Sequence, residues 1–234
     1  AMQQEFCDIS RNQKGELRIG IAFTRGRAVM PQLIPAFQRQ YPNVEVTLVE
    51  DSNDALQKLL ADGDIDLAIA EFSKAPQEVE LRNFYEETIV LCLSGALLAR
   101  CDIDLAAHEA ALRAGDLSSL RNCPFVLGPA EDIGGRMGRE MLRRSGVKPI
   151  VKATSANIET LLSLCEQGAG ACFSPENLIR TALSDAQIKR LHLLRFDSGA
   201  SYPIRFGYLR RSYQWSVIEE FIRIAQGAIA SPAG

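Results

Sequence analysis

The chain has 234 residues, 47% of them hydrophobic and 24% charged, which is enough for one large or two small globular domains around a substantial core. Its formal net charge of −3 argues against strong nucleic-acid binding by this chain alone, because neutralising phosphates requires an excess of basic residues. No run of about 18 apolar residues and no signal-peptide pattern occurs, so we predict no contact with a membrane.

Elements in the first third of the chain alternate between strand-like and helix-like patterns. The expected order is a strand over 17–23, a helix over 30–41, a strand over 44–50, a helix over 52–63 and a strand over 65–71. Ser52 is a candidate N-cap for the second helix, and Gly63 ends it. This β-α-β-α-β order predicts a parallel sheet with helices on its faces.

The same order returns later in the chain. A strand over 123–129, a helix over 136–146, a strand over 148–154, a helix over 155–168 and a strand over 169–174 are expected. Two similar α/β lobes follow from this repetition, with a ligand site where they join. A single sheet with more strands is the alternative.

Two strand-like segments, 85–95 and 202–211, are placed to carry the chain from the first lobe to the second and back. The closing segment 216–230 has helical periodicity, and we assign it to the first lobe. The predicted domains are a linker remnant or tag over 1–14, lobe I over 15–87 plus 205–234, and lobe II over 88–204.

Residues for catalysis or for holding a cofactor are not evident. His108 and His192 have no nucleophile in their sequence surroundings, and neither a GxSxG elbow nor a phosphate-binding loop is present. The alternating Asp62, Asp64 and Asp66 are interpreted as solvated carboxylates of a turn, because no downstream Glu completes a calcium loop. We therefore predict no enzyme activity, no catalytic residue, no cofactor and no metal.

The spacing of the cysteines also argues against a metal site. Six cysteines are scattered without CxxC spacing, which disfavours a structural zinc site. Most of them lie in apolar runs, where a small buried thiol is expected, and a redox-sensing thiol is the alternative. The absence of obvious disulfide pairs favours a cytoplasmic location.

An ordered set of motifs extends over about residues 15–230. It begins with a strand starting Leu-Arg-Ile-Gly, a Pro-x-Leu helix, Phe-x-x-x-Tyr-Pro, a Leu-rich helix ending at Gly, and Asp-Leu-Ala-Ile. It continues with FYEETIVLCLS, CPFVLG and CEQGAGACFSPENL. In this order the motifs resemble the effector-binding domain of LysR-type transcriptional regulators.

The resemblance implies an α/β fold of two Rossmann-like lobes joined by two crossover strands, similar to type II periplasmic binding proteins. It also implies a small effector in the cleft between the lobes and assembly as a homodimer or homotetramer. DNA would be bound only through an N-terminal winged helix-turn-helix, for which too few residues precede Leu17. We therefore interpret the chain as a truncated regulator.

Candidate ligand contacts in lobe I follow the carboxyl ends of its strands, where open parallel sheets bind ligands. Thr24 matches the Ser or Thr with which the family contacts effectors, and its neighbour Arg25 could bind an anion, although a solvated basic turn is the alternative. If Ser52 caps its helix, Asn53 faces the cleft. Glu71 matches another polar family contact; paired with an arginine, it would suit a zwitterion or a polar neutral ligand.

Lobe II supplies a second set of candidates. The candidates run from Pro129 to Arg136 within PAEDIGGRM, residues 129–137. Gly134 and Gly135 allow close approach to a bound carboxylate, with a flexible loop as the alternative. Ser155 is either an N-cap or a ligand contact, and Ser174 is expected near the floor of the cleft.

Together these features predict a sensor domain whose effector is a small organic acid or an amino-acid-like molecule. Binding would shift the population of lobe geometries and reset the oligomer. Two other classes remain open: a solute-binding protein of a transport system, and an α/β enzyme such as a transferase.

Overall fold

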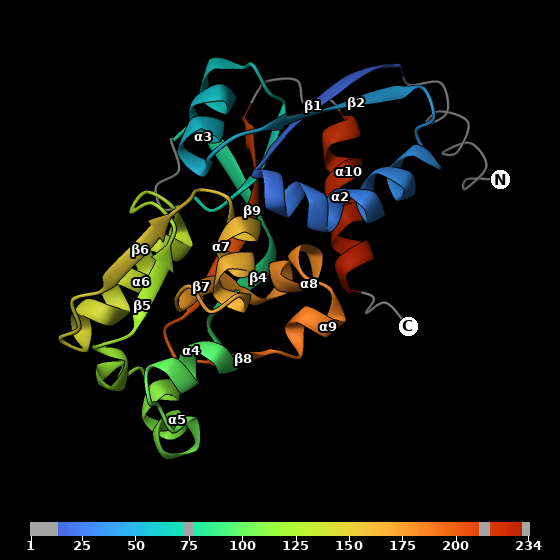
Figure 1. Cartoon of the computed structure of the whole chain (residues 1–234). Helices are drawn as coiled ribbons and strands as arrows, with labels where there is room; N and C mark the ends of the chain where they lie inside the picture. The colour runs from blue at the N-terminus through green and yellow to red at the C-terminus, as the bar shows by residue number, and fades with distance from the viewer. Residues whose placement is uncertain (1–13, 73–76, 211–215, 231–234) are drawn as a thin grey trace. The chain divides into compact units, whose positions relative to one another are not determined.

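The computed structural model describes residues 14–72, 77–210 and 216–230 (Figure 1). Contacts between residues divide the chain into two compact units. Unit 1 consists of Ala1–Glu86 and Pro203–Gly234, and unit 2 is Glu87–Tyr202. The predicted lobe boundaries, at 87/88 and 204/205, lie one and two residues from these limits. Most of the predicted linker remnant or tag lies outside the described residues. In the described part of the chain, no helix has both the length and the apolar character needed to cross a membrane.

Unit 1 is built on a sheet in the order β2-β1-β3-β9. Strands β1 (Gly15–Ile21), β2 (Val44–Glu50) and β3 (Leu67–Ala70) run parallel, whereas β9 (Ser201–Leu209) is antiparallel to β3. The parallel β-α-β-α-β arrangement predicted from the sequence is therefore confirmed.

Helices cover both faces of this sheet. Helix α3 (Asn53–Asp62) packs Leu56 and Leu60 against Ala68 and Ala70 of β3. On the opposite face, α2 (Phe23–Gln38) packs against α10 (Ser216–Ala230) (Figure 1). The rings of Phe37 and Phe221 lie 5.3 Å apart.

Unit 2 contains two groups of strands. The long strand β4 (Val79–Ser94) pairs antiparallel with β7 (Cys172–Pro175) and β8 (Leu191–Arg195). Strands β5 (Pro124–Leu127) and β6 (Ile150–Thr154) pair in parallel, as predicted. A parallel bridge between Phe125 and Ala171 links β5 to the residues before β7.

In unit 2 the sequence patterns missed the strand β8 and three short helices. The helical elements are α4 (Gly95–Arg100), α5 (Leu105–Arg113), the short 3₁₀ helix η1 (Ser118–Leu120), α6 (Ile133–Arg144), α7 (Ile158–Glu166), α8 (Glu176–Ala182) and α9 (Asp185–Ile188). Among them α4, α8 and α9 have seven residues or fewer, too few to show two full helical periods.

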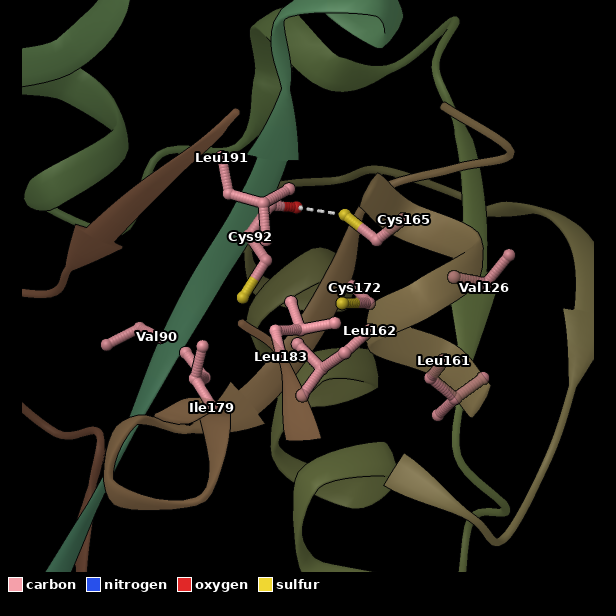
Figure 2. Close-up of a cluster of buried hydrophobic side chains, with 10 residues drawn as sticks. All are labelled: Val90, Cys92, Val126, Leu161, Leu162, Cys165, Cys172, Ile179, Leu183 and Leu191. Atoms are coloured by element: carbon pink, nitrogen blue, oxygen red, sulfur yellow. Dashed lines mark hydrogen bonds between the residues drawn. The ribbon is translucent and has the colours of Figure 1, made fainter. Parts of the chain in front are cut away.

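The core of unit 2 contains three of the cysteines (Figure 2). Cys92 of β4, Cys165 of α7 and Cys172 of β7 are wholly buried with Leu162 and Ile179. The Cys165 thiol donates a hydrogen bond to the backbone oxygen of Cys92, at 3.3 Å. Hydrogen bonding with the thiols of Cys165 and Cys92, together with burial, raises the pKa of Cys172 well above its ordinary value. The expectation of small buried thiols is confirmed for these three residues.

Strands β4 and β9 cross between the units, in the segments where the sequence predicts crossovers. At the start of unit 2 the hydroxyl of Tyr202 donates to the carboxylate of Glu87, and both side chains are buried. The hydroxyls of Thr88 and Ser201 are hydrogen-bonded to each other at 2.9 Å. Side chains therefore join the two crossover strands on unit 2.

Candidate functional site

The candidate residues of unit 1 follow the ends of three parallel strands. Ile21 of β1 is in register with Glu50 of β2 and with Ile69 of β3. All three carboxyl ends therefore lie at one edge of the sheet, where ligands of open α/β sheets bind. Thr24, Arg25, Asn53 and Glu71 come directly after these ends.

The structure after the end of β1 differs from the prediction. Instead of a strand to Phe23 followed by a turn, helix α2 begins at Phe23, so Thr24 and Arg25 lie in its first turn. Arg25 is only 4% exposed, which excludes the solvated basic turn. No side chain caps this helix, and its first turn contains no acidic residue. The backbone N–H groups of that turn therefore form a region of positive potential.

Asn53 and Glu71 lie together at the second and third strand ends. The backbone N–H of Glu71 donates to the side-chain oxygen of Asn53 at 3.2 Å. The amide of Gln57 donates to the backbone oxygens of both residues, at 3.3 Å each. The side-chain oxygen of Asn53 is thus engaged within the protein, whereas Ser52 caps α3 by accepting from Ala55. The sequence analysis missed Gln57, one turn after Asn53, although their i, i+4 spacing could have indicated it.

Glu50 is a second residue that the sequence analysis did not include. A Cβ atom added to Gly26 would lie 3.1 Å from a carboxylate oxygen of Glu50, so this side chain lies against the second turn of α2. It stands at the end of β2, as Glu71 stands after β3. This edge of unit 1 therefore combines a buried arginine with two carboxylate side chains.

In unit 2 the candidates follow the ends of β5 and β6. Leu127 and Thr154 are in register, and the backbone N–H of Ser155 donates to the oxygen of Leu127 at 3.3 Å. Pro129 and Ser155 therefore lie at the same edge of this parallel pair. Ser155 is not the N-cap of α7, because Asn157 caps this helix. The hydroxyl oxygen of Ser155 instead accepts from the backbone N–H of Asn157, at 3.1 Å.

Gly134 and Gly135 lie in the first turn of α6, which begins at Ile133 rather than at the predicted residue 136. The flexible loop is therefore excluded. A Cβ atom on Gly135 would lie 2.0 Å from the backbone oxygen of Pro129. Arg139 also joins the segment before α6 to its first turn, because its guanidinium donates to the backbone oxygens of Gly128 at 2.7 Å and of Gly135 at 3.1 Å. Gly135 is thus required by protein packing, with or without a ligand.

The beginning of α6 shares one feature with the beginning of α2. Asp132 occupies the N-cap position but makes no capping hydrogen bond, and burial raises its pKa. The first turn of α6 itself contains no acidic residue, and Arg136 lies exposed in the second turn. Ser174 is different, because it is fully buried in β7 and its hydroxyl donates to the backbone oxygen of Pro175 at 3.1 Å.

The structure thus gathers four candidates at one edge in unit 1 and Pro129, Gly134, Gly135 and Ser155 at one edge in unit 2, leaving Ser174 within a strand. Groups of three or more potential metal ligands are absent from the described residues. The interpretation of Asp66 as a solvated carboxylate is wrong, because it pairs with Arg18 at 2.9 Å. That contact raises the pKa of Arg18.

Known proteins resemble this chain over nearly its whole length. The family model described as the LysR substrate binding domain matches residues 10–230. An uncharacterized HTH-type transcriptional regulator of Bacillus subtilis, YcgK, is 27% identical over 97% of this chain and 71% of its own length.

Solved structures agree in fold. The effector-binding domain of QuiR in complex with shikimate has a TM-score of 0.70 and 13% identity, covering 92% of this chain and 97% of that one. The regulatory domain of Synechocystis PCC6803 CcmR in complex with 2-PG has a TM-score of 0.72 and 15% identity, with the same coverage. The predicted fold class, two α/β lobes of the type II periplasmic-binding-protein kind, is therefore confirmed. The chain belongs to the LysR substrate-binding domain family, the effector-sensing part of LysR-type transcriptional regulators.

Proposed function

We propose that this domain binds a small carboxylate, either an organic acid or an amino-acid-like molecule, through residues of both units. Unit 1 contributes Thr24 and Arg25 with the start of α2, and Asn53 and Glu71 at the neighbouring strand ends. Unit 2 contributes Pro129, Gly134, Gly135 and Arg136 around the start of α6, Ser155 after β6, and Ser174 of β7. Binding without catalysis is the role of the site.

The observation that carries this proposal is the contrast between capped and uncapped helices. Side chains cap α3, α4, α5 and α7 through Ser52, Ser94, Asp104 and Asn157. The long helices α2 and α6, which start at the candidate edges, have no such cap. A carboxylate could supply the missing acceptors, since N-terminal N–H groups and the helix dipole both favour an anion.

The charges near α2 narrow the class of ligand. Arg25 supplies a cation that could hold a carboxylate, while Glu50 and Glu71 place negative charge at the same sheet edge. An amino acid, which carries both charges, would match this combination better than a dicarboxylate would. Shikimate, the ligand named for the QuiR domain, is itself a carboxylate.

Thermal unfolding in the presence of a carboxylate and amino-acid panel tests the proposal. A ligand present at about 100 times its Kd stabilises the folded state by about 2.7 kcal/mol, which raises Tm by about 5–10 °C in a domain of this size. We expect at least one carboxylate to produce such a shift. The double variant Thr24→Ala/Arg25→Ala should abolish it.

Arg27→Ala is the matched control, because Arg27 lies exposed in the same helix and outside the proposed ligand set. It should retain the full ligand-induced shift. Stabilisation that survives the double variant would refute the assignment of the unit 1 site. A panel without any stabilising carboxylate or amino acid would refute the proposed ligand class.

The wider role follows from the family. LysR-type regulators bind small-molecule effectors and form oligomers, and we propose that this chain assembles as a homodimer or homotetramer in the cytoplasm. The effector would favour one arrangement of the two units and thereby bias the DNA-binding modules of a full-length regulator. An effector with equal affinity for both arrangements would have no regulatory effect.

A further inference from the structure

A cavity of unit 2 outside the proposed effector site contains a cysteine. Its volume is about 660 Å³, and its lining includes Arg100, Cys101, Asn122, Pro124 and Lys152. Asn122 and Pro124 are the two chain neighbours of Cys123, so the cavity brings Cys101 beside the segment that carries a second cysteine. Acidic side chains are absent from this lining among the described residues.

The end of helix α4 fixes the position of Cys101. The backbone N–H groups of Cys101 and Ile103 donate to the oxygens of Leu97 and Leu98, at 3.0 Å each. Asp102 has φ of 53°, the left-handed conformation that closes a helix, and it is the one non-glycine residue with positive φ in the described chain. Cys101 is therefore held in a defined turn while remaining partly exposed.

Cys123 lies below the surface, directly before β5. Its side chain is 1% exposed and contacts the thiol of Cys101. Burial, with a contribution from that contact, raises the pKa of Cys123 to about 12, whereas Arg100 acts in the opposite direction. Of the two thiols, Cys101 is thus the one that solvent and small oxidants can reach.

We propose that Cys101 and Cys123 form a reversible disulfide when a peroxide enters this cavity, which makes the pair an oxidation site separate from the proposed effector site. The thiolate of Cys101 attacks hydrogen peroxide, the O–O bond breaks, and the departing hydroxide takes a proton to leave as water, giving a sulfenic acid. The sulfur of Cys123 then attacks the Cys101 sulfur, and the S–O bond breaks. The released hydroxide takes the Cys123 proton and leaves as a second water.

The cationic lining should favour the first step. Arg100 and Lys152 line the cavity together with Cys101, and nearby cations stabilise a thiolate against its thiol. The three core cysteines provide a contrast within the same unit, because Cys92, Cys165 and Cys172 are wholly buried in an apolar cluster. They should stay reduced under conditions that oxidise the Cys101–Cys123 pair.

Peptide mapping of the peroxide-treated chain tests the proposal directly. Cleavage after lysine and arginine places Cys101 in the peptide 101–113 and Cys123 in the peptide 122–136. A Cys7→Ser background removes the thiol that lies outside the described residues. We expect a disulfide-linked 101–113/122–136 pair that a dithiol reductant separates, with Cys92, Cys165 and Cys172 recovered as alkylated thiols.

Two variants identify the steps. Cys123→Ala should leave Cys101 as a sulfenic acid that dimedone traps. Lys152→Gln should slow oxidation about threefold, because it removes one of the two cations that favour the thiolate. Lys189→Gln, an exposed cation outside the cavity lining, should not change the rate. Failure of the linked peptide pair to form in the Cys7→Ser chain, whether Cys101 stays reduced or stops at the sulfenic or sulfinic acid, would overturn the proposal.

Discussion

At the scale of single residues, two adjacent glycines have different roles. Gly134 and Gly135 were predicted together as backbone donors for a bound carboxylate, yet only Gly135 is pressed against neighbouring backbone. A Cβ atom there would lie 2.7 Å from the oxygen of Gly128, whereas one on Gly134 would lie 3.6 Å from the oxygen of Phe173. The first distance is a clash and the second an ordinary contact.

Alanine substitution at each glycine should separate these roles. Gly135→Ala should lower the free energy of unfolding by about 2 kcal/mol, because backbone atoms on both sides prevent relaxation. Gly134→Ala should stay within about 0.5 kcal/mol of the wild type. Urea unfolding measures both, and equal destabilisation by the two variants would contradict the packing argument.

At the scale of elements, the sequence predicted most strands and the longer helices but misplaced where α2, α6 and α7 begin. The apolar run over 17–23 suggested a strand, and apolar residues at helical spacing suggested a helix over 30–41. Helix α2 instead begins at Phe23 and includes Pro31 and Pro35. Packing of its buried face through Leu33 and Phe37 outweighs the two missing backbone donors.

For the candidate site, the sequence predicted where the strands end but did not predict the contacts between residues far apart in the chain. The strand ends could be located because apolar runs end where polar residues begin, and Ser52 was identified as a cap. The partner of Asp66 could not be found, since Arg18 is 48 residues away in the sequence and next to it only after the sheet forms. Likewise, the choice of Asn157 over Ser155 as the cap of α7 depends on backbone geometry.

The start of α7 gives a test at this scale. Asn157→Ala should cost about 1 kcal/mol of unfolding free energy, because its side chain accepts from the N–H groups of Glu159 and Thr160. Ser155→Ala should cost less than half of that, since Ser155 accepts one bond outside the helix. Urea unfolding of the two variants would contradict this assignment if Ser155→Ala were the more destabilising.

The contact between the end of α7 and the start of β8 should depend on pH. A hydrogen bond from Arg190 holds the pKa of Glu166 below its usual range. The contact therefore stabilises the fold above the pKa of an unfolded glutamate, about 4.3, and this contribution disappears as the pH falls through the lower folded value.

Urea midpoints of the wild type and of Arg190→Gln should therefore differ at pH 7 and converge as the pH falls below about 4. Arg180→Gln is the control, because its ion pair with Asp185 is longer, 3.6 Å, and more exposed. A difference for Arg190→Gln that stays constant with pH would show that the contact does not depend on the charge of Glu166.

At the scale of the whole molecule, each unit presents a helix without a side-chain cap at the edge where its parallel strands end. This arrangement results from the repeated β-α-β order, which places one such helix after the first parallel strand of each unit. We propose that one small molecule binds at both helix starts. The energy of those contacts could then favour one arrangement of the units over another.

Calorimetric titration of a ligand selected by thermal unfolding into variants of each unit tests this claim most directly. We predict one site per chain, with Arg25→Ala in unit 1 and Arg136→Ala in unit 2 each weakening affinity at least about tenfold, the loss of one charged contact of about 1.4 kcal/mol or more. Arg27→Ala should bind like the wild type. Affinity that depends on residues of one unit only would contradict the proposal that residues of both units bind the ligand.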